Sequence, residues 1–275
     1  MIRIFTTVII TSFLAGQGFV GQQFDNGSIN YSDRKIQATG IGAIPDIALT
    51  NAAQARRAAL RIAKVDAMRN LVEIVNGITV DSETTMSDAM FDDVIKTKVR
   101  GMIRGAVQVG DVKYLSDTSI EVVYEVPMSD IDAAIMFRDL LNEASESVGA
   151  GGLESGLSAP TTGAVTGLII DARGLGVRPA MSPQVLDQNG GIVYGPNNYD
   201  RKYAVTNGVA GYSKTPESAS KDQRVMGNPL IVKAVATAGT NKTDVVIGNS
   251  DIMKIKSADS SYGVLRDCRV LIILD

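Results

Sequence analysis

The residue types that most often carry chemistry in enzymes are scarce in this chain. Its 275 residues include no histidine, no tryptophan and a single cysteine, Cys268. Histidine is the commonest general base and metal ligand near neutral pH, and zinc sites and nucleophile pairs are built mainly from cysteine and histidine. The composition excludes Ser-His-Asp and Cys-His catalysis, Cys/His zinc sites and a disulfide within the chain. We therefore expect no catalytic residue, no cofactor and no metal ion.

Two glycine pairs have the spacing that opens a phosphate-binding loop. They are Gly40 with Gly42, and Gly174 with Gly176. The dinucleotide-binding loop needs a third glycine three residues later, so that a helix can pack closely on a strand. Here that position is a proline in both cases, Pro45 and Pro179. Both pairs are predicted to form tight turns rather than nucleotide sites.

Two other motifs are also better explained by local structure. Ser218 and Lys221 form the S-x-x-K pattern of penicillin-recognising enzymes, but the companion Lys-Thr-Gly and Ser-Asp-Asn motifs are absent. Asp187 begins a run that resembles a calcium loop, but the ligand spacing breaks down, and Asn189-Gly190 favours a β-hairpin turn. A pair of hydrolase carboxylates stays open at this point, because the separation that matters is spatial.

The charged residues favour protein surfaces as the functional feature. The chain has 27 Lys and Arg against 30 Asp and Glu, which gives no general footprint for nucleic acid. Basic residues do gather on one predicted helix. Such a row is usually the solvated face of a helix, and the alternative is a surface that contacts an acidic partner. The candidate interface residues are Arg56, Arg57, Arg61 and Arg69.

The helix that carries these arginines is predicted over residues 50–76. It contains no glycine or proline, Thr50 or Asn51 can serve as its N-cap, and Gly77 follows its end. Residues 35–41 and 119–126 are predicted strands, and residues 101–114 are predicted to pair with the second of these as a hairpin. A last helix is expected over 129–143. The apolar positions of the long helix repeat at three and four residues and include Leu60, Ala63, Ala67, Leu71 and Ile74.

The fold class that follows is α+β, with a helix-on-sheet N-terminal module and a strand-rich C-terminal module. In the second module we predict strands over 166–172, 183–187, 191–194, 230–236, 244–247 and 269–274, and a short helix over 249–257. The last strand is almost wholly apolar, which is typical of a central strand buried on both faces.

The N-terminal segment reads as an export signal. Arg3 is followed by an apolar run from Ile4 to Leu14, which is too short to span a membrane. Gln17 stands where a lipoprotein signal requires cysteine, so no direct lipid anchor is expected. We expect a periplasmic protein that can associate with the outer membrane. The predicted divisions are 1–21 signal peptide, 22–32 mobile lead-in, 33–144 first module, 145–165 Gly/Ser-rich linker and 166–275 second module.

Several stretches of the first module resemble a known family. The stretches are residues 36–42 (IQATGIG), 55–71 (ARRAALRIAKVDAMRNL), 77–81 (GITVD) and 99–106 (VRGMIRGA). They resemble the LPP20 family of FlgP-like flagellar envelope proteins, and the module is similar to the N-terminal domain of the flagellar assembly protein FlgT. The resemblance covers about residues 35–130. It implies only fold roles for the motif residues: Gly40 and Gly42 as a turn, Ala59, Ala63 and Ala67 as helix–sheet packing, and Gly101 and Gly105 as strand positions under the helix.

The function expected from these observations is non-enzymatic. The leading hypothesis is an exported structural or assembly protein of the bacterial cell envelope, homo-oligomeric, in a flagellum-associated ring or disc with other envelope or flagellar motor proteins as partners. Its interfaces would be the arginine-bearing helix and the sheet edges of the second module. The alternative is a monomeric periplasmic binding module that holds an envelope polymer or small ligand between the modules. A carboxylate-dependent hydrolase is a third hypothesis.

Overall fold

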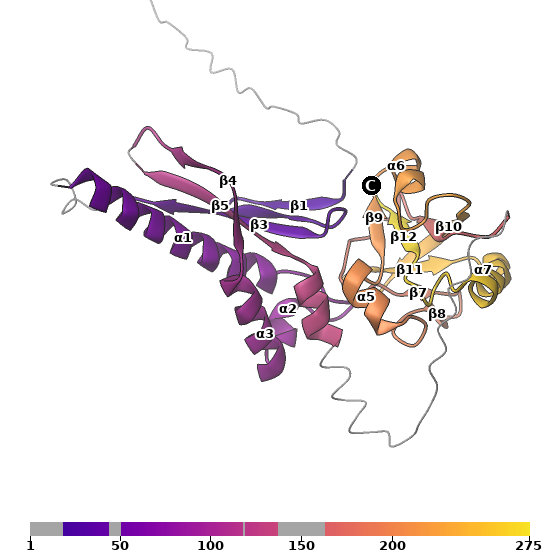
Figure 1. The fold of residues 1–275 in the computed structure, drawn as a ribbon. Helices are drawn as coiled ribbons and strands as arrows, with labels where there is room; N and C mark the ends of the chain where they lie inside the picture. The colour runs from indigo at the N-terminus through magenta and orange to yellow at the C-terminus, as the bar shows by residue number, and fades with distance from the viewer. Residues whose placement is uncertain (1–18, 44–50, 118, 137–162) are drawn as a thin grey trace, which may run out of the picture.

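A computed structural model describes residues 19–43, 51–117, 119–136 and 163–275. It confirms the α+β class, since an antiparallel sheet covered by a long helix is followed by a mixed sheet with short helices (Figure 1). Most of the predicted linker over 145–165 and most of the predicted signal peptide lie outside the described residues. No helix among the described residues is long and apolar enough to cross a membrane.

The first module is built on a five-stranded antiparallel sheet in the order β1-β2-β3-β5-β4. Strand β5 alternates as predicted, with every second side chain buried against the helix layer and the others facing the opposite side. The strands are β1 (Gly21–Phe24), β2 (Gly27–Asn30), β3 (Lys35–Gly42), β4 (Val107–Tyr114) and β5 (Ile120–Pro127).

Helix α1 (Ala52–Asn76) lies across one face of this sheet (Figure 1). The side chain of Asn51 caps it by accepting a hydrogen bond from the backbone N–H of Gln54 at 3.1 Å. Small residues face the sheet and are fully buried at a spacing of four, which brings the helix backbone close to β3. The buried residues are Ala55, Ala59, Ala63, Ala67, Leu71, Ile74 and Val75.

Gly40 and Gly42 are strand residues, so the prediction of a turn at this pair was wrong. Both lie in β3 directly under α1. A Cβ atom at Gly40 would lie 2.1 Å from the carbonyl oxygen of Ala63, and one at Gly42 would lie 2.0 Å from that of Ala59. The glycines are needed because the helix backbone occupies the space that a side chain would fill.

Two other segments of the first module differ from prediction. Residues 101–114 do not form one strand, because Gly101 lies in helix α3 (Asp93–Arg104), Gly105 caps that helix, and only β4 is extended. The apolar residues of α3 recur at helical spacing and outweigh the strand-like composition at its end. The short helix α2 (Met86–Ala89) precedes it, with a capping box at Thr85.

The expected mobile lead-in over 22–32 is instead the β1–β2 hairpin at the sheet edge. It is held there by buried apolar side chains, Val20, Ile29 and Tyr31. Further along, residues 129–136 are helical where the last helix was predicted to begin, and the rest of that helix lies outside the described part of the chain.

The second module has a seven-stranded mixed sheet in the order β8-β7-β11-β10-β6-β12-β9. Strand β12 is an internal strand between β6 and β9 and is buried along its whole length, as predicted for an almost wholly apolar strand. The strands are β6 (Leu168–Asp171), β7 (Val185–Leu186), β8 (Ile192–Tyr194), β9 (Gly211–Ser213), β10 (Leu230–Ala238), β11 (Asp244–Ile247) and β12 (Val270–Ile273). The helices are α5 (Arg201–Asn207), α6 (Pro216–Lys221) and α7 (Asn249–Tyr262).

The turn predictions in this module are confirmed. Gly190 has a φ of 83°, and the Asp187 carboxylate accepts hydrogen bonds from the backbone N–H groups of Asn189 and Gly191, so the segment is a hairpin turn. Gly174 and Gly176 also have positive φ, in the turn after β6. Helix α5, strand β9 and helix α6 were not predicted, because each is short and carries little periodicity.

The two modules pack against each other through one continuous set of buried side chains. The rings of Tyr31 and Tyr212 meet edge to face at 6.0 Å, and the Ser32 hydroxyl donates to the carbonyl oxygen of Tyr212 at 2.7 Å. In a second region the backbone N–H of Met181 donates a hydrogen bond to the carbonyl oxygen of Thr79 at 3.0 Å. Hydrogen bonds therefore join the modules in these two regions.

Candidate functional site on the outer face of helix α1

The structure places the four candidate arginines around α1 rather than in one row. The guanidinium of Arg56 lies 5.3 Å from the ring centroid of Tyr114 in β4, and Arg69 lies 3.5 Å from the Asp66 carboxylate. Arg57 and Arg61 are exposed and one turn apart, so they share a side of the helix. Two of the four thus interact within the chain, and the other two face solvent.

A stripe of large apolar side chains runs along the side of α1 that faces away from the sheet. Ile62 is 44% exposed, Val65 is 57% exposed and Val72 is 39% exposed. With Ala58 and Arg69 they form the outer stripe, whose members alternate four and three residues apart. From Ala55 to Ala67 the residues of α1 that are buried against the sheet are alanines, and Leu71, Ile74 and Val75 continue the buried side, while Ile62, Val65 and Val72 face solvent.

The exposed large apolar residues of the outer stripe depart from the usual distribution of side chains on a surface helix. A helix that packs on a sheet normally buries its largest apolar residues and exposes polar ones. Burying a valine or isoleucine stabilises by about 1.5–3 kcal/mol, so leaving three exposed on one stripe forgoes that gain in the isolated chain. A contiguous apolar stripe of this kind is typical of a surface that contacts another protein.

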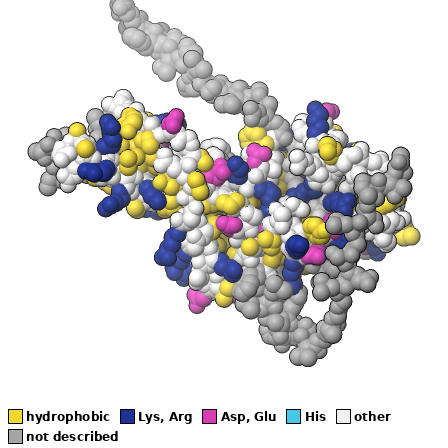
Figure 2. All heavy atoms as spheres, viewed as in Figure 1, with side chains coloured by type: hydrophobic (Ala, Val, Ile, Leu, Met, Phe, Trp, Pro, Cys, Tyr) yellow, Lys and Arg dark blue, Asp and Glu magenta, His cyan; other side chains and the backbone are white. Residues whose placement is uncertain are grey.

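The two flanks of the outer stripe carry opposite charges. On the side toward β4 and β5 lie Arg57, Arg61 and Lys64, and the Lys64 amine is 5.6 Å from the ring centroid of Tyr124. On the other side lie Asp66, which accepts a hydrogen bond from the backbone N–H of Ile41 in β3, and Glu73. Figure 2 shows Lys and Arg side chains gathered over the region of α1, with hydrophobic side chains between them.

The outer stripe could have been found in the sequence. Its four-three spacing is present in the run from Ala58 to Val72, but the buried stripe of alanines and leucines has helical spacing as well. The pattern of Leu60, Ala63, Ala67, Leu71 and Ile74 predicts the core side, and the outer stripe then falls among the residues expected on the solvated face.

The opposite face of the first module's sheet does not form an apolar surface like the outer stripe. Its exposed residues include Ile41 and Val107, but ion pairs cross it between neighbouring strands. Lys35 lies 3.0 Å from Glu125 and Lys113 lies 2.8 Å from Glu121. Paired charges on one side of an antiparallel sheet are typical of a face that meets water.

The sheet edges of the second module are short. The edge strands β8 and β9 have three residues each. The carbonyl oxygen of Tyr212 in β9 already accepts a hydrogen bond from Ser32 of the first module. Short or covered edges are a common way to prevent strand pairing with other chains, so these edges are weaker candidates than the outer stripe.

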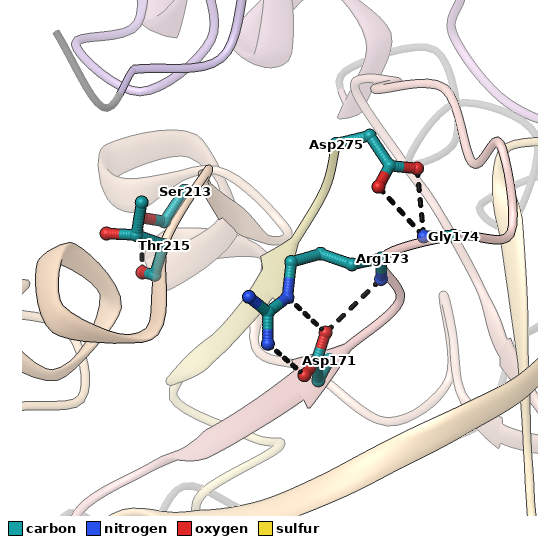
Figure 3. A network of polar contacts seen from close by, with 6 residues as sticks. All are labelled: Asp171, Arg173, Gly174, Ser213, Thr215 and Asp275. Atoms are coloured by element: carbon teal, nitrogen blue, oxygen red, sulfur yellow. Dashed lines mark hydrogen bonds and ion pairs between the residues drawn. The ribbon is translucent and has the colours of Figure 1, made fainter. Parts of the chain in front are cut away.

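A polar cluster lies where the parallel strands β6, β9 and β12 end (Figure 3). Such ends bind ligands in many α/β sheets. Here the Arg173 guanidinium donates to the Asp171 carboxylate at 2.8 and 2.7 Å and holds the pKa of Asp171 below its ordinary value. The Asp275 carboxylate accepts from the backbone N–H of Gly174 at 2.8 Å. These contacts join groups within the cluster, and they fix the turn after β6.

Between the modules lies a small hollow lined by Arg34, Asp132, Tyr31, Tyr212 and neighbouring apolar residues. Its volume is about 10 Å³, which is room for one water molecule. The Arg34 guanidinium pairs with the Asp132 carboxylate, which is 1% exposed. Burial raises the pKa of Asp132 to about 7 in spite of the arginine. The buried pair joins the β2–β3 turn to the helical segment over 129–136.

The described residues offer little for nucleophilic or metal chemistry. No group of three Asp, Glu, Cys or His side chains within the described ranges is placed to hold a metal ion. Cys268 is buried in the turn before β12, and burial raises the pKa of its thiol to about 11. At neutral pH this side chain is a protonated thiol, which is a poor nucleophile.

Comparisons with known proteins concern the second module. Residues 167–275 match the family described as Treponema pallidum Tp0624, second domain. A comparison with curated proteins found no match. The second module is therefore similar to the second domain of that treponemal protein.

Proposed function

We propose that this protein is a structural subunit of the bacterial cell envelope that assembles with copies of itself. The observation that carries the proposal is the outer stripe of α1, in which Ile62, Val65 and Val72 face solvent although the buried side between Ala55 and Ala67 holds only alanines. A helix that leaves large apolar residues exposed gains stability when a partner covers them. Assembly through this face would bury the exposed apolar side chains of the outer stripe.

Other features support the envelope setting. The predicted signal peptide supports export to the periplasm, and Gln17 in place of a lipobox cysteine argues for retention by partners rather than by a lipid. The resemblance of residues 35–130 to the LPP20 family supports a flagellum-associated ring or disc. The alternative, a monomeric binding module, has less support, because the hollow between the modules holds about one water molecule.

The proposal is tested by measuring the mass of the purified protein by light scattering over a concentration series at low and high salt. We expect a discrete multimer whose dissociation increases with salt, because charged flanks border the interface. The double variant Arg57→Glu with Arg61→Glu should remain folded, as judged by circular dichroism, and dissociate at concentrations at which the unaltered protein is assembled. A protein that is monomeric at every concentration contradicts the proposal.

A further inference from the structure

We propose that two copies of this chain pair through their outer stripes with the α1 helices side by side and parallel. The inference rests on the proposed function and adds to it the partner, the contact residues and the orientation. It follows from three features of α1: the spacing of the stripe, the position of Arg69 within it, and the signs of the charges on its flanks.

The spacing of the outer stripe is that of a coiled-coil seam. From Ala58 to Val72 the members are separated by four, three, four and three residues, which is a repeat of 3.5. Ile62 and Val65 are the first and second seam positions of one heptad, and Arg69 and Val72 are those of the next. A seam of this length is about 21 Å long. It is enough to place two helices in register, and a pair held by this seam alone will be weak.

Arg69 restricts the ways in which the stripe can be covered. A polar residue at a single seam position lowers stability but fixes register in coiled coils. Here the guanidinium lies 3.5 Å from the Asp66 carboxylate of its own helix, which holds its charge toward the acidic flank of the stripe. A membrane or a purely apolar groove would leave that charge without water. A second copy accommodates it at the edge of the contact.

The charges on the two flanks of the outer stripe favour one relative direction of the paired α1 helices. In an antiparallel pair each flank faces the same flank of the other helix, which sets Asp66 and Glu73 against acids and Arg61 against bases. In a parallel pair the acidic flank of one helix faces the basic flank of the other, on both sides of the seam. Arg61 and Asp66 occupy the two flanking positions that form interhelical ion pairs in parallel coiled coils. Like charges in direct opposition destabilise a contact, so the flanks favour the parallel arrangement. In that arrangement Arg69 meets its own copy across the seam, and each Arg69 guanidinium is turned to Asp66 of its own helix.

Cysteine crosslinking tests the orientation. The only native thiol, Cys268, is buried, so a cysteine introduced at an exposed position can be oxidised selectively. We would prepare Ile62→Cys, Val65→Cys and Val72→Cys separately, and Ser116→Cys in the exposed β4–β5 turn as the matched control. Each protein is oxidised mildly and analysed on a non-reducing gel, and its mass before oxidation is measured by light scattering.

In a parallel pair identical residues face each other, so all three stripe variants should form disulfide-linked dimers at least several-fold more than the Ser116→Cys control. Crosslinking at only one of the three positions indicates an antiparallel crossing and overturns the inference. A multimer with no more crosslinking at the stripe than at Ser116 also overturns it, but leaves the proposed self-assembly intact. A monomer in light scattering overturns both.

Discussion

At the scale of single residues, Asp132 is the buried acid whose ionisation lowers the free energy of unfolding. It is buried beside Arg34 at the junction of the modules, and burial raises its pKa to about 7. In an unfolded chain an aspartate titrates near its ordinary value of about 4. Between these two values the folded protein binds more protons than the unfolded chain, so the contribution of Asp132 to stability decreases as the pH rises.

We therefore predict that the free energy of unfolding is pH-dependent between about pH 4 and pH 7 because of this residue. Relative to Asp132→Asn, which keeps the shape without the charge, the protein should lose roughly 2–4 kcal/mol over that range. Urea unfolding of both proteins at several pH values measures the difference. If the difference in the free energy of unfolding between the two proteins is the same at every pH, the Asp132 carboxyl group does not take up a proton on folding.

At the scale of elements, the packing of α1 on β3 depends on small residues on both sides. A Cβ atom at Gly40 would lie 2.1 Å from the Ala63 carbonyl oxygen and 2.3 Å from the Ala67 nitrogen. These are backbone atoms, so the whole helix would have to move. Gly101 in α3 is the opposite case, because nothing lies within 4 Å of its Cβ position.

Gly40→Ala should destabilise the protein by about 1–3 kcal/mol or more, because it forces the helix off the sheet. Gly101→Ala makes the same chemical change in an open helical position and should stabilise by roughly 0.5–1 kcal/mol. Thermal and urea unfolding of the two variants provide the comparison. Equal effects at the two positions would contradict the close approach of α1 and β3.

Most of these elements could be predicted from the sequence where one periodicity dominates. Helix α1 and strand β5 have clear repeats, and Asn189-Gly190 specifies its turn locally. Helix α3 was missed because its end is glycine-bearing and apolar and reads equally well as a strand. Gly40 and Gly42 read as turn residues, because the closeness of a helix from elsewhere in the chain is not a local property.

The candidate site was predicted only in part. The helix was identified, and Arg57 and Arg61 lie on its exposed side. The outer stripe was missed, because two overlapping periodic patterns on one helix do not show which of them faces the sheet. That choice is made by β3, whose two glycines accept Ala59, Ala63 and Ala67 at close range and leave the outer stripe facing solvent.

At the scale of the whole molecule, the two modules are expected to unfold together. Tyr31 of the first module is buried against Tyr212 of the second, and the Tyr212 hydroxyl bonds both the backbone N–H and the carbonyl oxygen of Ala180 at 3.0 and 2.9 Å. The buried side chains form a continuous set across the junction. Cooperative unfolding follows when the contacts between units are as well packed as those within them.

Calorimetry should therefore give a single unfolding transition for the protein. Tyr31→Ala removes a large buried side chain at the junction and should cost about 3–5 kcal/mol. In this variant the transition should move to lower temperature and can split into two. If the unaltered protein already shows two separate transitions, the modules are independent and the junction does not couple them.

The central claim is that the outer stripe of α1 is an assembly surface. Light scattering on Val65→Asp tests it most directly, with Met253→Asp as the control, since Met253 is also an exposed apolar residue in a helix, in α7 of the second module. We predict that Val65→Asp has the mass of a monomer at concentrations at which the unaltered protein and Met253→Asp are multimers. If Val65→Asp keeps the same mass as the unaltered protein, the outer stripe is not the surface through which this chain assembles.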